Sequence, residues 1–204
     1  RDAPAIVYYL WGLLWWLGGA SHEVSRFVVF DTRPDALLVV VAVTAWIAAE
    51  VHRRMPARAL VLTTLAMLLC AFPLALWQAD VHRQPFAGYG ALAWVVFAVL
   101  GVRSLWCLRG GQDRAAVAAQ FVWWLLWPTV VSLAASWLAD RFELAQGWAL
   151  AAALLPWLVV VTVSLQRWRW LTLPLGERFN VARHALQATL FAVLGLAWVG
   201  FLFA

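Results

Sequence analysis

The chain has 204 residues, of which 65% are apolar and only 12% are charged, and its mean hydropathy is +0.81. A water-soluble domain is usually about half apolar and about a quarter charged, so these proportions exclude an ordinary soluble fold. Two cysteines among sixteen tryptophans exclude a disulfide scaffold, and the apolar content excludes a disordered chain, which leaves a polytopic membrane protein.

The formal charge is +5, and every basic residue is an arginine. The arginines fall between apolar runs instead of clustering on one hydrated face, so we expect no nucleic acid partner. Anionic lipid headgroups are the expected partner of such residues. Cys70 and Cys107 lie within apolar stretches, where cysteine usually behaves as a small buried side chain. We therefore predict no disulfide, no metal and no cofactor.

Seven apolar segments come close to the roughly 20 residues that a helix needs to cross about 30 Å of hydrocarbon. Helices are expected because the apolar runs are continuous and do not alternate as the strands of a barrel would. The predicted fold class is an all-α membrane protein with about seven transmembrane helices, forming one polytopic domain over residues 1–204. The predicted spans are residues 5–20, 36–51, 59–77, 86–102, 115–139, 144–165 and 185–203.

The first two spans need separate arguments. Residues 5–20 are apolar enough for a signal peptide, but no basic region precedes them and no small-x-small site ends the run before His22. We therefore interpret them as a span. The second span is the weakest, because Asp35 and Glu50 leave fourteen uncharged residues between them. The chain opens at Arg1 without a methionine, and we expect it to be part of a longer protein.

The arginines in the loops predict an orientation. Seven alternating spans place eleven of the fifteen arginines on the side of the amino terminus and four on the other side. Such a bias favours a cytoplasmic amino terminus, with the carboxyl end of the chain at the opposite face. The eleven are Arg1, Arg53, Arg54, Arg58, Arg103, Arg109, Arg114, Arg167, Arg169, Arg178 and Arg183, and the four are Arg26, Arg33, Arg83 and Arg141.

Short similarities suggest a parallel internal repeat. Residues 11–15 (WGLLW) resemble residues 123–127 (WWLLW), and Thr64-Leu65 corresponds to Thr189-Leu190. The partners lie four spans apart, so the two copies would point in the same direction across the membrane. Chance matching among leucine, alanine and tryptophan is the alternative.

Tryptophan is the most prominent feature of the composition. Its ring favours the headgroup level of a membrane, so anchoring explains the tryptophans near the span ends. Two deeper sets admit two interpretations: helix packing or lipid contact on one side, and an aromatic platform for a sugar or isoprenoid chain on the other. The deeper sets are Trp11, Trp15 and Trp16, and Trp123, Trp124 and Trp127.

Ionisable residues are absent from the middle of every predicted span, which argues against a proton-coupled transporter. Uncharged polar residues do occur within the spans. We expect these to bond to the helix backbone or to a neighbouring helix. They are Thr44, Thr63, Thr64, Gln120, Ser132, Ser136 and Gln187.

Histidine and acidic residues follow three odd-numbered spans at the predicted outer face. Such groups can provide acid–base chemistry or bind a divalent ion. Their spacing matches no metal motif, and the chain contains no nucleotide-binding or hydrolase motif. Solvated helix ends are the alternative interpretation. These candidate catalytic residues are His22, Glu23, Asp80, His82, Asp140 and Glu143.

The last loop on the predicted inner side interleaves arginine with tryptophan in residues 166–170 (QRWRW). This pattern beside a span suits anionic headgroups, at on the order of 1 kcal/mol per basic residue. The predicted headgroup-binding residues are Arg53, Arg54, Arg167, Trp168, Arg169 and Trp170.

Two segments resemble a known family. Residues 11–19 (WGLLWWLGG), followed by His22-Glu23, and residues 173–180 (LPLGERFN) are similar to stretches of the large bacterial inner-membrane proteins grouped as domain of unknown function 2339. Members of that family are long chains with many more spans than seven. The resemblance implies an inner-membrane location and a larger parent protein, and it brings no established catalytic residues.

We therefore expect a structural or binding domain of a larger envelope protein rather than an enzyme. Its expected partners are membrane lipids and the remainder of a longer chain or other membrane subunits. The alternative is a membrane enzyme or transporter that handles a lipid-linked or glycan substrate at the outer face. A water-filled cavity that joins the outer-face residues would favour the alternative, and dry, tightly packed helices would favour the first function.

Overall fold

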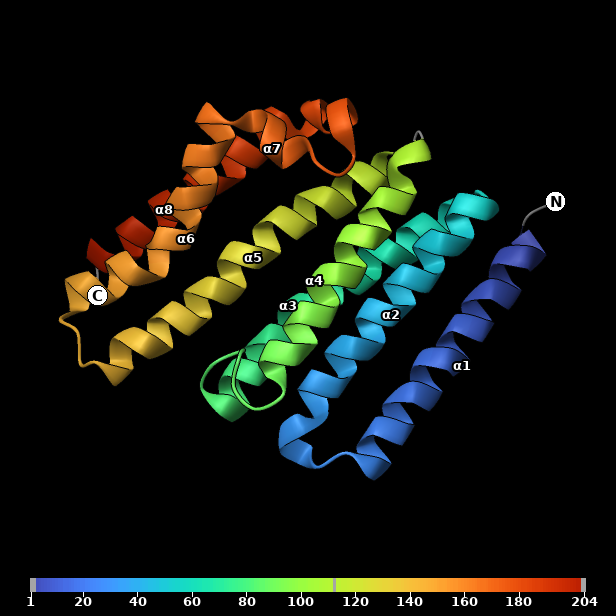
Figure 1. Cartoon of the computed structure of the whole chain (residues 1–204), viewed down its shortest axis with the longest axis horizontal. Helices are drawn as coiled ribbons and strands as arrows, with labels where there is room; N and C mark the ends of the chain where they lie inside the picture. The colour runs from blue at the N-terminus through green and yellow to red at the C-terminus, as the bar shows by residue number, and fades with distance from the viewer. Residues whose placement is uncertain (1–2, 112, 203–204) are drawn as a thin grey trace.

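The computed structural model describes residues 3–111 and 113–202, and the secondary structure of this part of the chain consists of helices joined by short turns, without strands (Figure 1). The all-α fold class predicted from the sequence is confirmed. The elements are α1 (Ala3–Phe27), η1 (Phe30–Thr32), α2 (Arg33–Arg54), α3 (Arg58–His82), α4 (Gly90–Cys107), η2 (Leu108–Gly110), α5 (Arg114–Arg141), α6 (Gln146–Gln166), α7 (Trp168–Thr172), η3 (Gly176–Ala182) and α8 (Arg183–Leu202), where η denotes a 3-10 helix.

Six helices among the described residues are long and apolar enough to cross a membrane, where the sequence predicts seven spans. The predicted span without a counterpart among these six helices is residues 5–20, which lie in α1. Five of the residues of α1 are tyrosines and tryptophans, whose rings carry polar atoms. Phe203, the predicted end of the last span, and Arg1 lie outside the described residues. The six are Phe30–Arg54, Arg58–His82, Gly90–Gly110, Arg114–Arg141, Gln146–Gln166 and Gly176–Gly200.

The fourth span begins later than predicted. Residues 83–89 form a turn, and α4 starts at Gly90 instead of residue 86. The turn needs positive φ angles at Arg83 and Gly88, of 64° and 58°. It also passes so close to α4 that a Cβ at Gly90 would lie 2.1 Å from the Pro85 carbonyl oxygen. Residues 86–89 are apolar enough to resemble part of a span, but in the structure they belong to this tight turn.

Two hydrophobic clusters hold the helices together, and α5 contributes to both. The larger cluster lies between α2, α3, α4 and α5 and includes the fully buried Leu38, Leu68 and Leu126. The smaller cluster joins α6, α7, η3 and α8 around Phe179 and Leu186, with side chains of α5 packed against it. α5 therefore links the two parts of the bundle.

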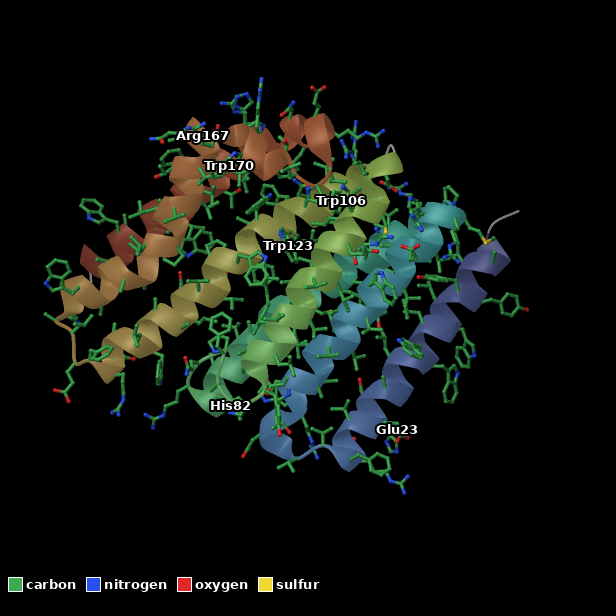
Figure 2. The ribbon with its side chains drawn as sticks, viewed as in Figure 1. Glu23, His82, Trp106, Trp123, Arg167 and Trp170 are labelled. Atoms are coloured by element: carbon green, nitrogen blue, oxygen red, sulfur yellow. The ribbon has the colours of Figure 1, made fainter. Side chains whose placement is uncertain are left out.

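Trp123 lies between α4 and α5, within the larger cluster (Figure 2). Its ring stacks on Phe97 at a centroid distance of 5.8 Å. Gly101 makes room for this ring, because a Cβ there would lie 2.3 Å from the indole. For the set of Trp123, Trp124 and Trp127, the interpretation as helix packing is confirmed. On α1, by contrast, Trp11 and Trp15 are 59% and 66% exposed.

Six of the seven uncharged polar side chains named above bond to backbone carbonyl oxygens, as predicted, and Ser136 has no such bond in the part of the chain that the structure describes. The Thr44 hydroxyl donates to the Val40 carbonyl oxygen at 2.7 Å, which is a bond within one helix turn. The Gln187 amide donates to the Ser164 carbonyl oxygen at 3.1 Å and thereby joins α8 to α6. These bonds satisfy polar groups that an apolar surrounding would otherwise leave unpaired.

The alternation of the helices creates two end surfaces (Figure 1). One end carries α7 and η3, and we call it the arginine face. The other end, the acidic face, carries the turns that join α1 to η1, α3 to α4 and α5 to α6. The described arginines of the arginine face are Arg53, Arg54, Arg58, Arg103, Arg109, Arg114, Arg167, Arg169, Arg178 and Arg183.

Candidate functional site

The strongest candidate site is the surface formed by α7 and η3, which fold over the arginine face (Figure 1). A buried side chain of α5 holds this connection in place. The Gln120 amide donates to the carbonyl oxygens of Leu171 and Leu173 at 2.6 and 3.1 Å, and its own carbonyl oxygen accepts the Leu175 N–H at 3.0 Å. One side chain therefore satisfies three backbone groups of the connection.

Trp168 joins α7 to η3 and α8. Its ring stacks on Phe179 with centroids 5.6 Å apart, and its indole N–H donates to Asn180 Oδ1 at 2.7 Å. The Arg183 guanidinium carbon lies 5.5 Å from the centre of the Trp168 ring. Trp168, one of the predicted headgroup residues, is therefore buried as a support of the site, whereas Trp170 is 63% exposed (Figure 2).

Two cavities share a border on this surface. The first has a volume of about 840 Å³ and the second about 800 Å³, and Arg169, Thr172 and Glu177 line both. Glu177 is the one acidic residue among their lining side chains. We call the five arginines of the two cavities the arginine platform. They are Arg109, Arg167, Arg169, Arg178 and Arg183.

Arg178 connects the platform to the segment between α4 and α5. Its Nη1 donates to the Arg109 carbonyl oxygen at 2.6 Å and also to the Gly111 carbonyl oxygen. The platform is thus assembled from η2, α7, η3 and α8, which are held together by side-chain bonds to the backbone. Guanidinium groups present paired N–H donors that match the oxygens of a phosphate or carboxylate. This arrangement can bind an anion.

Arg53 and Arg54, also predicted to bind headgroups, lie in a separate ion-pair cluster around Glu50. Arg53 donates to Glu50 Oε1, and Arg103 donates to Glu50 Oε2 at 3.4 Å. Arg54 Nη2 lies 3.8 Å from Glu50 Oε1, and the Cys107 thiol donates to Oε2 at 3.1 Å. Much of the charge of Arg53 is therefore already matched by a carboxylate.

On the acidic face, the structure brings together two of the six candidate catalytic residues. Asp140 and Glu143 line a cavity of about 500 Å³ together with Arg83 and Arg141. The other four candidates do not line this cavity. His22 and Glu23 lie exposed on α1, and Asp80 is exposed at the end of α3, whereas His82 is partly buried.

His82 instead faces Asp35, a residue that the sequence identifies only as the boundary of a span. His82 Nε2 lies 3.8 Å from Asp35 Oδ2. Asp35 Oδ1 accepts the Gln78 amide N–H at 2.7 Å, and Gln78 Oε1 accepts the Trp94 indole N–H at 2.8 Å. We call Asp35, Gln78, His82 and Trp94 the Asp35 network. The one feature of the sequence that could have indicated this network is Gln78, a single amide side chain in an otherwise apolar run.

Two atoms of the Asp35 network are buried without a hydrogen-bond partner in the part of the chain that the structure describes: Asp35 Oδ2 and His82 Nε2. These two atoms face each other across the 3.8 Å gap. Among residues 3–111 and 113–202, no group of three or more histidine, cysteine, aspartate or glutamate side chains is placed to hold a metal ion. The network joins α2, α3 and α4 just below the acidic face.

No protein-family model, curated protein or solved structure matches this chain.

Proposed function

We propose that this chain is a multi-pass membrane domain that binds phosphate-bearing, anionic lipid headgroups at its arginine platform. The observation that carries this proposal is the pair of adjoining cavities, which five arginines line with Glu177 as their one acidic residue. Because both cavities open at the end of a bundle of apolar helices, the platform would lie at the level of the headgroups. The exposed Trp170 beside the arginines supports this position, because tryptophan concentrates at membrane interfaces.

The proposal includes the topology and the location. α1 is a 25-residue helix that lies along α2, and we take it as a seventh span. The arginine face then lies in the cytoplasm, where the positive-inside rule places it. The setting is a bacterial inner membrane and a larger envelope protein, on the strength of the resemblance described above. The parallel internal repeat remains part of this proposal.

The alternative function, a membrane enzyme or transporter that acts on a lipid-linked or glycan substrate, has less support. Its candidate residues at the acidic face are spread over separate surfaces, with Asp140 and Glu143 in one cavity and His82 turned towards Asp35. Trp123, which was a candidate for an aromatic platform, is packed inside the bundle. These observations favour a binding domain.

The proposal is tested by removing charge from the platform without disturbing its supports. Arg167 and Arg169 are exposed, and neither holds the fold through a hydrogen bond of its guanidinium group in the described chain. At on the order of 1 kcal/mol for each basic residue, the double change Arg167→Gln with Arg169→Gln should weaken phosphatidylglycerol binding roughly 30-fold. Native mass spectrometry of the purified chain, titrated with this lipid in a neutral detergent, measures the change.

The matched control removes the same charge from the acidic face, by Arg26→Gln with Arg141→Gln. We expect this control to bind phosphatidylglycerol like the unchanged chain, because neither arginine belongs to the platform. Phosphatidylcholine, whose headgroup has no net charge, should bind equally to all three chains. Equal losses of phosphatidylglycerol in the two variants would mean that total charge, and not the platform, governs binding.

A further inference from the structure

A second binding site lies between α1 and the main bundle, at the depth of the helices. A groove of about 460 Å³ separates α1 from α2 and α3. α1 contacts these helices through two polar bonds: the Tyr9 hydroxyl with the Thr63 hydroxyl at 2.7 Å, and the Trp16 indole N–H with the Thr44 hydroxyl at 3.0 Å. Gly12, between Tyr9 and Trp16, also lines the groove.

Most polar groups on the walls of the groove are already bonded, and the hydroxyl of the exposed Tyr8 is the exception. The Thr44 hydroxyl donates to the Val40 carbonyl oxygen and accepts the bond from the Trp16 indole N–H. The Thr63 hydroxyl donates to the Ala59 carbonyl oxygen, which makes Tyr9 the donor in the bond between Tyr9 and Thr63. The remaining wall is apolar, with Leu13, Ile47 and Val51 among its side chains, so an apolar part of an occupant fits the groove best.

The end of the groove at the arginine face is basic. Val51 and Leu60 line this end, and Arg54 and Arg58 lie within one helical turn of them in the sequence. The side chains of Arg54 and Arg58 are 74% and 80% exposed. The nearest carboxylate oxygens, from Glu50 and Asp113, lie 3.8 Å from the guanidinium nitrogens of Arg54 and Arg58. An occupant with an anionic head and an apolar tail therefore complements both parts of the groove.

We infer that the groove binds one acyl chain of an anionic phospholipid, with the phosphate beside Arg54 and Arg58. Gly12 borders open space in the groove, because an added Cβ at this position would meet no atom within 4 Å. The two polar bonds of α1 hold the walls apart at a set distance. This inference rests on the proposed membrane location but is independent of headgroup binding at the arginine platform.

The experiment uses a phosphatidylglycerol that carries a photoactivatable diazirine in its acyl chain. The purified chain is labelled in detergent, and mass spectrometry of peptides locates the cross-links. We expect labelling of the groove walls on α1 and α2, around Leu13 and Ile47. Gly12→Leu should fill the groove and reduce this labelling about tenfold or more, with Gly12→Ala intermediate. Because alanine favours a helix more than glycine does, we expect the Gly12→Ala chain to fold.

The matched control is Gly19→Leu, which adds the same side chain to α1 at another open position outside the groove. This control should label like the unchanged chain. The headgroup is tested with phosphatidylcholine that carries the same diazirine chain. The unchanged chain should prefer phosphatidylglycerol in the groove roughly tenfold, and Arg54→Gln with Arg58→Gln should remove this preference.

Three results would overturn the inference: unchanged groove labelling in Gly12→Leu, an equal decrease in Gly19→Leu, or equal labelling of the groove by the two lipids. The arginine platform is judged separately. Arg167→Gln with Arg169→Gln should leave the cross-links at Leu13 and Ile47 unchanged, because α7 lies on the far side of the bundle from α1 (Figure 1). Loss of headgroup binding at the platform and loss of the groove lipid are therefore distinguishable.

Discussion

Gln78 is the centre of the Asp35 network at the level of single residues. The side chain is fully buried and bonds through both of its polar atoms, as donor to Asp35 and as acceptor from Trp94. Because Asp35 and Trp94 lie on α2 and α4, one amide connects three helices. Removing it would leave a buried carboxylate oxygen and a buried indole N–H without these partners, which is more costly than losing one exposed bond.

Gln78→Leu should therefore lower the free energy of unfolding by about 2 to 4 kcal/mol, even though leucine fills much of the same volume. Unfolding in mixed micelles with increasing amounts of a denaturing detergent measures this loss. The matched control is Gln187→Leu, since Gln187 is only half-buried and donates one bond to the backbone of α6. We expect a loss of about 1 kcal/mol there. Equal losses in the two variants would contradict the bridging role of Gln78.

Polar contacts within a span could be predicted from the sequence, but those between distant residues could not. Thr44 bonds to a carbonyl oxygen four residues earlier, which is the local geometry of any helix. Asp35 and Gln78 are 43 residues apart, and their contact depends on how α2 packs against α3. His82 illustrates the limit: the sequence identified it as a candidate, but its neighbour Asp35 follows from the tertiary structure alone.

The contact between α4 and α5 depends on a missing side chain. At Gly101 an added Cβ would lie 2.3 Å from the ring of Trp123, which is buried and stacked on Phe97. The ring cannot give way easily, because it also meets Trp127 edge to face at 5.3 Å. The Trp123 ring therefore packs directly against the backbone of α4 because position 101 is glycine.

Gly101→Ala should lower the free energy of unfolding by about 1 to 3 kcal/mol, because the methyl group overpacks the interface of α4 and α5. The control is Gly195→Ala on α8, where an added Cβ meets nothing within 4 Å. That change should raise the stability by up to about 1 kcal/mol, since alanine has the higher helix propensity. Detergent-induced unfolding of both variants measures the difference. Stabilisation by both changes would show that Trp123 moves aside freely.

The sequence predicted the long helices better than the short connections. Hydropathy follows the burial of a span in lipid and so locates α2, α3, α5, α6 and α8. It misplaces the start of α4, because the turn of residues 83–89 is held by a close backbone approach. It cannot detect α7 and η3, which are too short to span a membrane and are held in place through Gln120.

At the scale of the whole molecule, the arginine platform is built from segments that are distant in the sequence. Residues 166–170 already predict an interfacial site, and Arg167 and Arg169 do line the first cavity. Arg109 joins the second cavity from the segment before α5, and Arg178 binds the backbone there. Which arginines form the platform therefore follows only from the folded structure. Its positive charge, by contrast, follows from the composition of the chain.

The separation of charge between the two faces predicts how the molecule lies in the membrane. A reporter enzyme that is active only outside the cytoplasm should be active when fused after Asp31 and silent when fused after Arg54, because positive loops remain in the cytoplasm. The fusion after Asp31 contains one long helix, α1, so its activity also tests whether α1 spans the membrane. A fluorescent protein that folds only in the cytoplasm, fused at the amino terminus, is the complementary control and should fluoresce. Activity after Arg54 with silence after Asp31 would reverse the orientation and place the arginine platform on the outer surface.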